Sequence, residues 1–383
     1  MSRLRVLAMT KLFPSSVEPL LAPFNRQQFA ALAKQCDLTV LATVPWFPGK
    51  QGAAPPRHEL IDGLPVEHPK TLYVPKLPGV GGVLYAASIL RDVIARRGGI
   101  DVLFAAWAHP DGTAAVLLGK LLRLPVVVKV HGTDVNLLST MPGAAKNLRW
   151  VLPRANRVVA VSRPLAEKLR DLGVYPERID LVYNGVDSTR FHPRDRAAER
   201  RALGVAADRE LVVYVGNLKR TKGAIDLLEA WTKVAAARPR AELVLIGEGE
   251  DRAACEAVVS RLGGRARLAG ARPPDEVGAW LGACDLLCLP SWAEGTPNVV
   301  LEALASGRRV VATAVGGIPD LVTSPQVGAL VPPRDVEALA SALIAELGVT
   351  YDPRDIGRAS VSGDWDHSAA RLLETLRKAV EMG

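Results

Sequence analysis

Two glutamates around the start of one expected helix are the residues whose types and spacing most favour chemistry. Glu294 and Glu302 are separated by seven residues, and Gly295, Thr296 and Pro297 follow the first of them. Thr296 suits a helix N-cap and Pro297 suits the first helical turn, so the pattern predicts Glu294 in a loop and Glu302 inside the helix. Two carboxylates in this arrangement can accept hydrogen bonds from the hydroxyls of a ligand.

The elements that must position these acids can be predicted from the surrounding residues. The apolar run at 286–289 is typical of a buried strand, and Gly307 is a suitable helix stop. A strand that leads into a helix N-terminus creates an anion-accepting crevice at the carboxyl edge of a sheet. The segment therefore suits hydroxyls beside a phosphate, as in a nucleotide sugar, although a capping acid with a solvated helix face would also give two glutamates at this spacing.

The residues after the second glutamate carry a resemblance to a known family: Ala303, Ala305, Gly307, Val310 to Thr313 and Gly316-Gly317-Ile318-Pro319-Asp320. In combination with the two glutamates, they resemble the donor site of retaining glycosyltransferases of family 4. The resemblance implies that Glu302 hydrogen-bonds ribose hydroxyls and that Glu294 meets the sugar ring. It also implies that backbone amides line the sugar and phosphate at Gly295, Thr296, Pro297, Asn298 and Val299.

Apolar strand-like runs alternate with helical patterns through two successive series, which predicts α/β architecture with doubly wound parallel sheets. The resemblance implies the GT-B fold, in which two Rossmann-like domains face each other across a cleft and a C-terminal helix crosses back to the N-terminal domain. We place the hinge near Asp187. The N-terminal, acceptor-side domain then comprises 1–187 with the helix at 365–383, and the C-terminal, nucleotide-sugar-binding domain comprises 188–364.

The loop after the first strand of the second series brings cations to a possible diphosphate site. Lys222 is the main candidate for that contact, because a fixed ammonium stabilises the charge that collects on a departing phosphate. The family often has Arg where this chain has Asn217, and Lys219 or Arg220 could supply the missing charge. By the same resemblance, further donor contacts are expected at Gly216, Asn217, Gly247 and Gly270, the last beside the base.

The first series offers His131 at the end of the strand 126–130, and the resemblance implies that this histidine reaches the donor sugar near its anomeric centre. The alternative is a histidine bonded to local backbone. Asp134 is expected to cap the following helix. His109 and Arg26 are candidate acceptor contacts, although the sequence after His109 is also a good turn without any ligand.

The implied reaction is the transfer of a hexose-type sugar from a nucleotide-diphosphate sugar to an acceptor hydroxyl, with retention at the anomeric carbon. The departing phosphate oxygen would take the acceptor's proton, so no side-chain base is assigned. No cofactor is expected, and no metal is predicted because we identify no Asp-x-Asp of the kind expected of a metal-dependent sugar transferase. A GT-B nucleotide-sugar epimerase and a non-catalytic carbohydrate-binding protein stay open as alternatives, whereas the loops that would need Gly-x-Gly-x-x-Gly in a dehydrogenase lack it.

Charge is unevenly distributed along the 383 residues. Residues 1–190 carry 24 Lys and Arg against 14 Asp and Glu, whereas the remainder carries 24 against 26. A basic first domain suits an anionic membrane surface or a phosphate-bearing acceptor, such as a saccharide or a lipid-linked one, and a solubilising surface is the ordinary alternative. Nucleic acid is not expected. The chain is expected in the cytoplasm, with or without peripheral contact to the inner face of the membrane.

Overall fold

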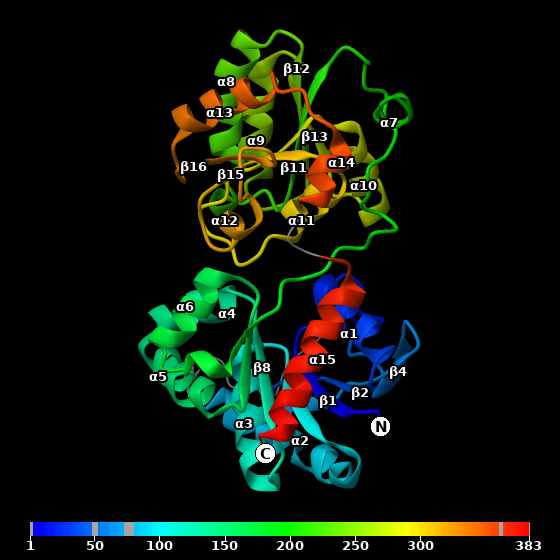
Figure 1. Cartoon of the computed structure of the whole chain (residues 1–383), viewed down its shortest axis with the longest axis vertical. Coiled ribbons are helices and arrows are strands. Elements are labelled where there is room, and N and C mark those ends of the chain that lie inside the picture. Colours follow the sequence, from blue (N-terminus) through cyan, green and yellow to red (C-terminus); the bar gives the residue numbers. More distant parts are fainter. Residues whose placement is uncertain (1–2, 48–52, 73–79, 360–362, 383) are drawn as a thin grey trace. The chain divides into compact units, whose positions relative to one another are not determined.

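The computed structural model describes residues 3–47, 53–72, 80–359 and 363–382. The chain forms two compact units: the first comprises Met1–Gly185 with Trp365–Gly383, and the second comprises Val186–Asp364 (Figure 1). Val186 and Asp364, at the two ends of the second unit, form an isolated parallel bridge. The boundary lies two residues before the hinge position that the sequence suggests near Asp187.

The first unit is built on an eight-stranded sheet in the order β10-β9-β8-β7-β1-β2-β5-β4, parallel except for the antiparallel pair β4 and β5. Its strands are β1 Arg5–Thr10, β2 Asp37–Ala42, β4 His58–Ile61, β5 Leu64–Glu67, β7 Val102–Ala105, β8 Val126–Val130, β9 Arg157–Ala160 and β10 Ile179–Leu181. A small second sheet pairs β3 Val44–Trp46 with β6 Lys70–Leu72. The central strands are buried on both faces, which explains their continuous apolar runs.

Helices of the first unit connect and cover these strands: α1 Pro23–Ala33, α2 Gly81–Ile94, α3 Thr113–Leu122, α4 Thr133–Asn136, α5 Pro142–Val151, α6 Arg163–Asp171 and α15 Trp365–Glu381. The last helix follows the whole second unit in sequence, yet it packs beside α1 (Figure 1). Ala369, Leu372 and Leu376 of α15 are fully buried in the same core cluster as Phe29 and Leu32 of α1. The expected return of the C-terminal helix to the N-terminal domain is therefore confirmed.

The second unit has a parallel six-stranded sheet in the order β13-β12-β11-β14-β15-β16. Its strands are β11 Glu210–Val215, β12 Ala241–Ile246, β13 Ala266–Gly270, β14 Leu286–Leu289, β15 Arg309–Thr313 and β16 Gly328–Val331. Its helices are α7 Arg196–Ala202, α8 Ala224–Ala237, α9 Arg252–Val259, α10 Pro274–Ala283, α11 Asn298–Ala305, α12 Ile318–Leu321, α13 Val336–Glu346 and α14 Pro353–Arg358. The order in which successive strands are added reverses between β11 and β14, and ligands of such sheets bind outside the carboxyl ends at that switch point.

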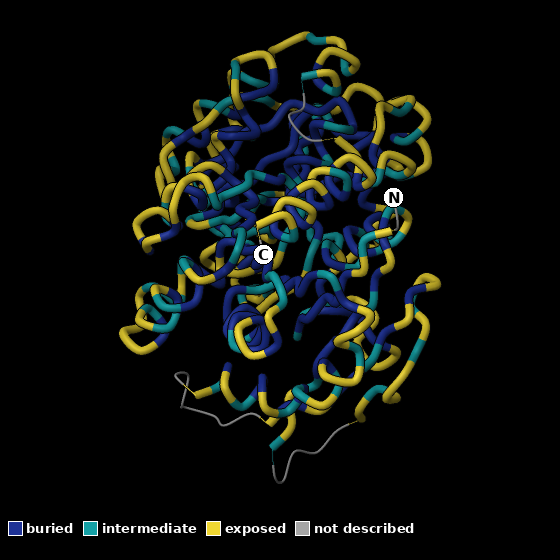
Figure 2. Tube along the Cα trace, turned by 60° about the horizontal axis from the view of Figure 1, so that its bottom comes forward, coloured by how far each residue is buried: buried dark blue, intermediate teal, exposed yellow. Residues whose placement is uncertain are grey.

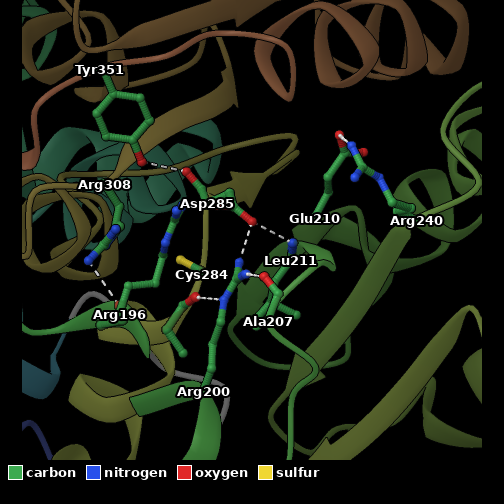
Figure 3. Close-up of polar contacts among 12 residues, drawn as sticks. Arg196, Arg200, Ala207, Glu210, Leu211, Arg240, Cys284, Asp285, Arg308 and Tyr351 are labelled. Carbon is green, nitrogen blue, oxygen red and sulfur yellow. Dashed lines mark hydrogen bonds and ion pairs between the residues drawn. The ribbon is translucent and has the colours of Figure 1, made fainter. Parts of the chain in front are cut away.

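The amino edge of this second sheet is closed by a polar cluster around Asp285 (Figure 3). The Asp285 carboxylate accepts hydrogen bonds from Arg200, 2.6 Å away, and from the Leu211 amide, 2.7 Å away, and it also pairs with Arg196. The Tyr351 hydroxyl donates to the Asp285 carbonyl oxygen at 2.7 Å. These bonds connect α7 and the loop before α14 to the start of β14, so the cluster holds the fold together at the edge opposite the switch-point loops.

Buried residues gather inside each unit, and exposed ones follow the outer turns (Figure 2). All four cysteines are buried and make no disulfide. Among the described residues, no helix combines the length and the apolar character that crossing a membrane requires. An Asp-x-Asp does occur outside the expected donor loops, at Asp364 and Asp366, but Asp366 binds Lys34 on α1. No group of three or more His, Cys, Asp or Glu in the described ranges has an arrangement that could hold a metal ion.

Candidate active site

Lys222 and Glu294 meet at the switch point of the second unit. Lys222 follows β11 and Glu294 follows β14, and Nζ of the lysine donates to Oε1 of the glutamate at 2.7 Å. The two loops approach closely because Gly223 has a φ of +71° and a Cβ there would lie 2.0 Å from the Pro290 carbonyl oxygen. Only glycine fits this position without displacing the backbone. Two predicted site residues from separate loops are therefore brought together.

Glu294 is held by more than the lysine. The Ser291 hydroxyl donates to the same Oε1 at 2.7 Å, and the Thr313 hydroxyl donates to the Ser291 carbonyl oxygen. The glutamate side chain is 9% exposed and the lysine side chain 32% exposed. The carboxylate is therefore nearly buried, whereas the ammonium is partly open to solvent. Both hydrogen bonds that the described residues make to this carboxylate go to Oε1. The carboxylate is oriented before any ligand arrives.

The loop before α12 packs directly on the residues after Glu294. The Gly317 amide donates to the Gly295 carbonyl oxygen at 2.7 Å, and Gly316 lies so close to the Glu294 carbonyl oxygen that a Cβ would approach to 2.0 Å. The Gly-Gly pair that the sequence offers after β15 therefore lets two backbones touch. The close packing fixes the path of the chain from Glu294 to the start of α11.

The start of α11 differs from the sequence-based expectation by one residue. Pro297 occupies the N-cap position and Asn298 is the first helical residue, so the predicted N-cap role of Thr296 is wrong. Proline cannot extend a side-chain acceptor to the helix amides, and the cap carries no side-chain hydrogen bond. Gly307, with a φ of +72°, follows the C-cap as expected.

Glu302 lies in α11, and its carboxyl is the most perturbed acid of the second unit. Burial raises the pKa of Glu302 to about 7, and the negative charge of Asp187 acts in the same direction. Asp187 itself accepts from the Thr189 amide at 3.1 Å, as a turn residue does. Ionisation of such a carboxyl is costly without a ligand, so hydroxyl groups that donate hydrogen bonds to it can strongly stabilise its ionised form.

The other expected donor residues of the second unit lie on adjoining strand ends. The Gly216 amide donates to the Ile246 carbonyl oxygen and the Gly247 amide to the Gly270 carbonyl oxygen, each at 3.0 Å. Asn217 has an exposed side chain, and its carbonyl oxygen accepts from the Tyr214 hydroxyl at 2.9 Å. The structure thus brings Gly216, Asn217, Gly247 and Gly270 to one edge of the sheet, where their contact with a ligand stays a prediction.

His131 follows β8 in the first unit, against two aromatic rings. Its ring centroid lies 4.8 Å from that of Phe24 and 5.7 Å from that of Trp107. Burial lowers the pKa of His131 well below its usual range, and the charge of Lys129 lowers it further. The ring hydrogen-bonds to the Ala106 backbone, whereas its buried Nε2 has no hydrogen-bond partner among the described residues. In a neutral imidazole that donates through its other nitrogen, Nε2 can accept a hydrogen bond from a hydroxyl group.

Asp134 does not cap a helix, contrary to the expectation. Its carboxylate accepts from the amides of His131, at 2.9 Å, and Gly132, at 3.0 Å, and from the Ala108 amide at 3.0 Å. Because the first two amides follow β8 and the third follows β7, Asp134 ties together two neighbouring strand-end loops. Burial raises the pKa of Asp134 to about 6, although its backbone hydrogen bonds oppose the rise.

The two residues suggested as acceptor contacts differ in their surroundings. His109 is buried, and its Nδ1 lies 3.0 Å from the Thr113 hydroxyl. Thr113 donates to Asn147 at 2.8 Å, so the hydroxyl is an acceptor toward the histidine. Arg26 pairs with Asp62 through two hydrogen bonds of 2.6 Å. An acceptor would have to displace this ion pair to use Arg26.

The sequence reasoning missed residues beside the Lys222 and Glu294 pair. Ser291, which orients Glu294, and Trp292, whose ring contacts the guanidinium of Arg334, stand inside the segment that drew attention to the site. Their position directly after an apolar strand was an available signal, because strand-end residues of parallel sheets line the crevice. Lys219 binds Glu250 at 3.6 Å, whereas Arg220 lies over the ring of Trp292.

Comparisons with known proteins match both units. Residues 25–190 match the profile described as glycosyltransferase family 4, and residues 209–347 match glycosyl transferases group 1. The Bacillus subtilis (strain 168) glycosyltransferase TuaC, named for teichuronic acid biosynthesis, is 29% identical over 99% of this chain and 95% of its own length. The D-inositol 3-phosphate glycosyltransferase of Segniliparus rotundus is 34% identical over 78% of this chain and 71% of its own length.

Solved structures agree on the fold. The Anabaena protein Alr3699/HepE in complex with UDP superimposes with a TM-score of 0.73, at 20% identity, over 98% of this chain and 100% of that chain. At this identity the likeness concerns the fold, which is the two-domain GT-B fold expected from the sequence. The matched profiles and relatives agree with this fold. The chain therefore belongs to glycosyltransferase family 4 and is a retaining glycosyltransferase that takes its sugar from a nucleotide-sugar donor.

Proposed function

We propose that the enzyme transfers a hexose from a UDP-hexose to a hydroxyl of an anionic saccharide or polyol, in the synthesis of a polysaccharide or glycolipid. The observation that carries this proposal is the arrangement at the switch point of the second unit. There Lys222 follows β11, the oriented Glu294 follows β14, and Glu302, whose pKa burial raises to about 7, lies in α11 at the end of the same loop. The UDP in the related Anabaena structure supports the choice of base.

In the proposed donor complex, Lys222 neutralises the diphosphate. An ammonium has three donors, so it can keep Glu294 while it binds a phosphate oxygen. Glu302 accepts from the two ribose hydroxyls, and Glu294 offers Oε2 to the sugar hydroxyls because Oε1 is occupied. The backbone from Gly295 to Val299 lines the sugar and phosphate, with N–H donors at every residue but Pro297 and with the positive end of the α11 dipole near the negative charge.

The reaction breaks the bond between the anomeric carbon and the β-phosphate oxygen, and the bonding electron pair stays with the phosphate. The acceptor oxygen forms its bond to the anomeric carbon on the same face, and its proton passes to the departing phosphate oxygen. Lys222 stabilises the charge as it accumulates, which makes it worth more in the transition state than in the ground state. His131 accepts a hydrogen bond from a sugar hydroxyl through Nε2 and so orients the ring.

The first unit is proposed to bind the acceptor. Residues 112–166 contain eight Lys and Arg and a single acid, Asp134, which is buried. The names of the two relatives contain teichuronic acid and inositol 3-phosphate, an acid and a phosphate ester that are both anionic. We therefore place a carboxylate or phosphate on the acceptor, near His109 and Arg26.

A thermal-shift screen tests the donor site. Purified protein is heated with UDP, GDP, ADP and their hexose conjugates, because a ligand that binds only the native state raises the melting temperature. Stabilisation by the uridine compounds is expected, and Glu302→Ala should abolish it. Lys233→Ala, which breaks an exposed ion pair with Glu337, is the matched control and should respond like the parent. If no nucleotide stabilises the parent protein, the proposed donor site is wrong.

Contact with an anionic membrane is a second proposal, carried by the surface of α3 and α5. Trp150 has Lys120 5.2 Å and Arg154 4.9 Å from its ring, and Leu121 nearby on α3 is 64% exposed. Basic residues beside exposed apolar ones favour binding to anionic lipid. Flotation with phosphatidylglycerol vesicles should carry the protein, and a Lys120→Glu, Arg154→Glu variant should not float. Equal flotation of both proteins would contradict the proposal, and phosphatidylcholine vesicles are the lipid control.

A further inference from the structure

Trp292 is fixed in position and carries two arginines over its ring. Its Nε1 donates to Asp226 at 2.6 Å, and its amide donates to the Thr221 carbonyl oxygen at 2.9 Å. The guanidinium carbon of Arg334 lies 4.2 Å from the ring centroid, and that of Arg220 lies 5.7 Å away. Each guanidinium is thereby placed by cation–π contact, although both side chains extend from exposed residues.

The backbone of Arg334 is unusual. Its φ is +63°, in the left-handed region, and it stands between Pro333 and Asp335, whose side chain caps α13 by accepting from the Ala338 amide. Glycine would adopt this conformation without strain, whereas an arginine costs about 1 kcal/mol or more. Backbone strain at an exposed loop residue indicates that the side chain of this residue has a function. The placement over Trp292 indicates what positions it.

The positive charge of the two arginines is not neutralised locally. Among the described residues, neither Arg220 nor Arg334 comes within ion-pair distance of a carboxylate. The nearby acids have other partners: Asp226 accepts from the indole, Asp335 from a helix amide, and Glu294 from Lys222. An exposed pair of guanidiniums beside an aromatic ring is a receptor for a planar anion.

The arginines adjoin the donor site. Arg220 and Lys222 belong to the same short turn, and Trp292 stands two residues before Glu294 in the loop after β14. The side chains of that turn diverge, because Lys222 binds Glu294 whereas Arg220 lies over Trp292. An anion at the arginines would therefore be a separate group from the one that Lys222 binds.

We propose that Arg220, Trp292 and Arg334 form a second anion subsite, which binds a carboxylate on the sugar that is transferred. A carboxylate matches the two-pronged guanidinium, whereas the diphosphate is served by the point charge of Lys222 and by backbone amides. The subsite shares a loop with Glu294, which meets the sugar ring in the proposed function, and the inference rests on that donor site. The donor would then be a nucleotide uronic acid.

Titration calorimetry with UDP-glucuronate and UDP-glucose tests the subsite. The parent protein should bind UDP-glucuronate about 10-fold more tightly, because the carboxylate adds charge-assisted hydrogen bonds. Arg220→Gln with Arg334→Gly should abolish this preference while leaving the affinity for UDP-glucose within about 2-fold. Arg334→Gly should not lower the melting temperature, since glycine suits the backbone, and Arg334→Asn gives a second variant compatible with a positive φ. Arg240→Gln, an exposed arginine before β12, is the charge-matched control.

Four outcomes would overturn the subsite. Equal affinity of the parent for the two donors would do so, as would a preference that survives in the double variant. An equal loss of both affinities in the double variant would instead assign the arginines to the diphosphate. If the parent binds neither compound, the proposed donor site itself fails, and the subsite fails with it. Binding of UDP-glucose without a carboxylate preference leaves the proposed function intact.

Discussion

At the amino edge of the second sheet, Arg196 and Arg200 both bind the carboxylate of Asp285 (Figure 3). At the carboxyl edge, Arg220 and Arg334 lie over Trp292 without an ion pair among the described residues. Arg200 is almost fully buried, and both guanidiniums of the carboxyl edge are exposed. The difference teaches how one residue type serves two purposes. Paired charges stabilise the fold, and unpaired charges at the switch point remain available to a substrate.

The largest effect is expected from Lys222→Ala at the carboxyl edge. Removing the cation should lower kcat/KM by about 10²–10³-fold, because charge on the departing diphosphate loses its compensation. The melting temperature should change little, since the lysine is partly exposed. Steady-state kinetics on the purified variant measure the loss. Activity near the parent level would show that the two edges do not divide their tasks as we infer.

Arg200→Ala tests the opposite edge. It should lower the free energy of unfolding by about 3 kcal/mol, because the Asp285 carboxylate and two carbonyl oxygens lose a buried donor. Urea denaturation measures this change. The folded fraction should keep the nucleotide affinity of the parent. A specific loss of affinity with normal stability would contradict the structural role of this edge.

Glu302→Gln sharpens the comparison through pH. The folded-state pKa of about 7 lies above the ordinary value of 4.5, so the folded protein holds the proton to higher pH than the unfolded chain does. The cost of ionising Glu302 is therefore absent below about pH 4.5, grows as the pH rises from about 4.5 to about 7, and is fully present above that. At pH 8 the glutamine variant should melt roughly 2–4 °C higher than the parent, and at pH 4.5 the two should coincide.

Although Glu302→Gln should raise the melting temperature at pH 8, it should weaken the binding of the nucleotide. If the ionised carboxylate accepts the ribose hydroxyls, the parent's affinity for UDP should rise with pH through about 7, whereas the variant should bind weakly at every pH. Calorimetry from pH 5.5 to pH 8 would show it. A variant that keeps the parent's affinity and pH profile would remove Glu302 from the donor site.

Lys233→Ala should have the smallest effect. The lysine and its partner Glu337 are both more than half exposed, and exposed pairs contribute little. Melting temperature and kcat/KM should match those of the parent. A clear loss in either would mean that surface pairs between α8 and α13 matter to the second unit, and this control would then have to be replaced by Arg240→Gln.

Much of the architecture could be predicted from the sequence because parallel strands buried on both faces give continuous apolar runs. The runs 126–130 and 286–289 match β8 and β14 residue for residue. The strands β10 and β16 were missed, since Leu181 and Leu330 belong to short, partly exposed edge strands without a clear pattern. Local signals were weaker at caps, where Pro297 took the position expected of Thr296.

The sequence did not predict which residues far apart in the chain contact each other within the site. Motif resemblance selected Lys222 and Glu294, but their 2.7 Å contact depends on how two loops approach through Gly223. Asp134 was assigned to a helix cap because its sequence neighbours are helical, whereas its carboxylate binds an amide that follows a different strand. The arginines over Trp292 were not foreseen either, because Arg334 is 42 residues from the ring in sequence.

The position of α15 has a consequence for how the enzyme is made. The ribosome completes the second unit before it releases the residues that α15 contributes to the first. Until then, the apolar surface of the first unit that Ala369, Leu372 and Leu376 cover has no partner. A nascent chain therefore exposes this surface for the time needed to synthesise nearly half the protein, during which chaperone binding is expected and premature termination would yield an aggregation-prone product.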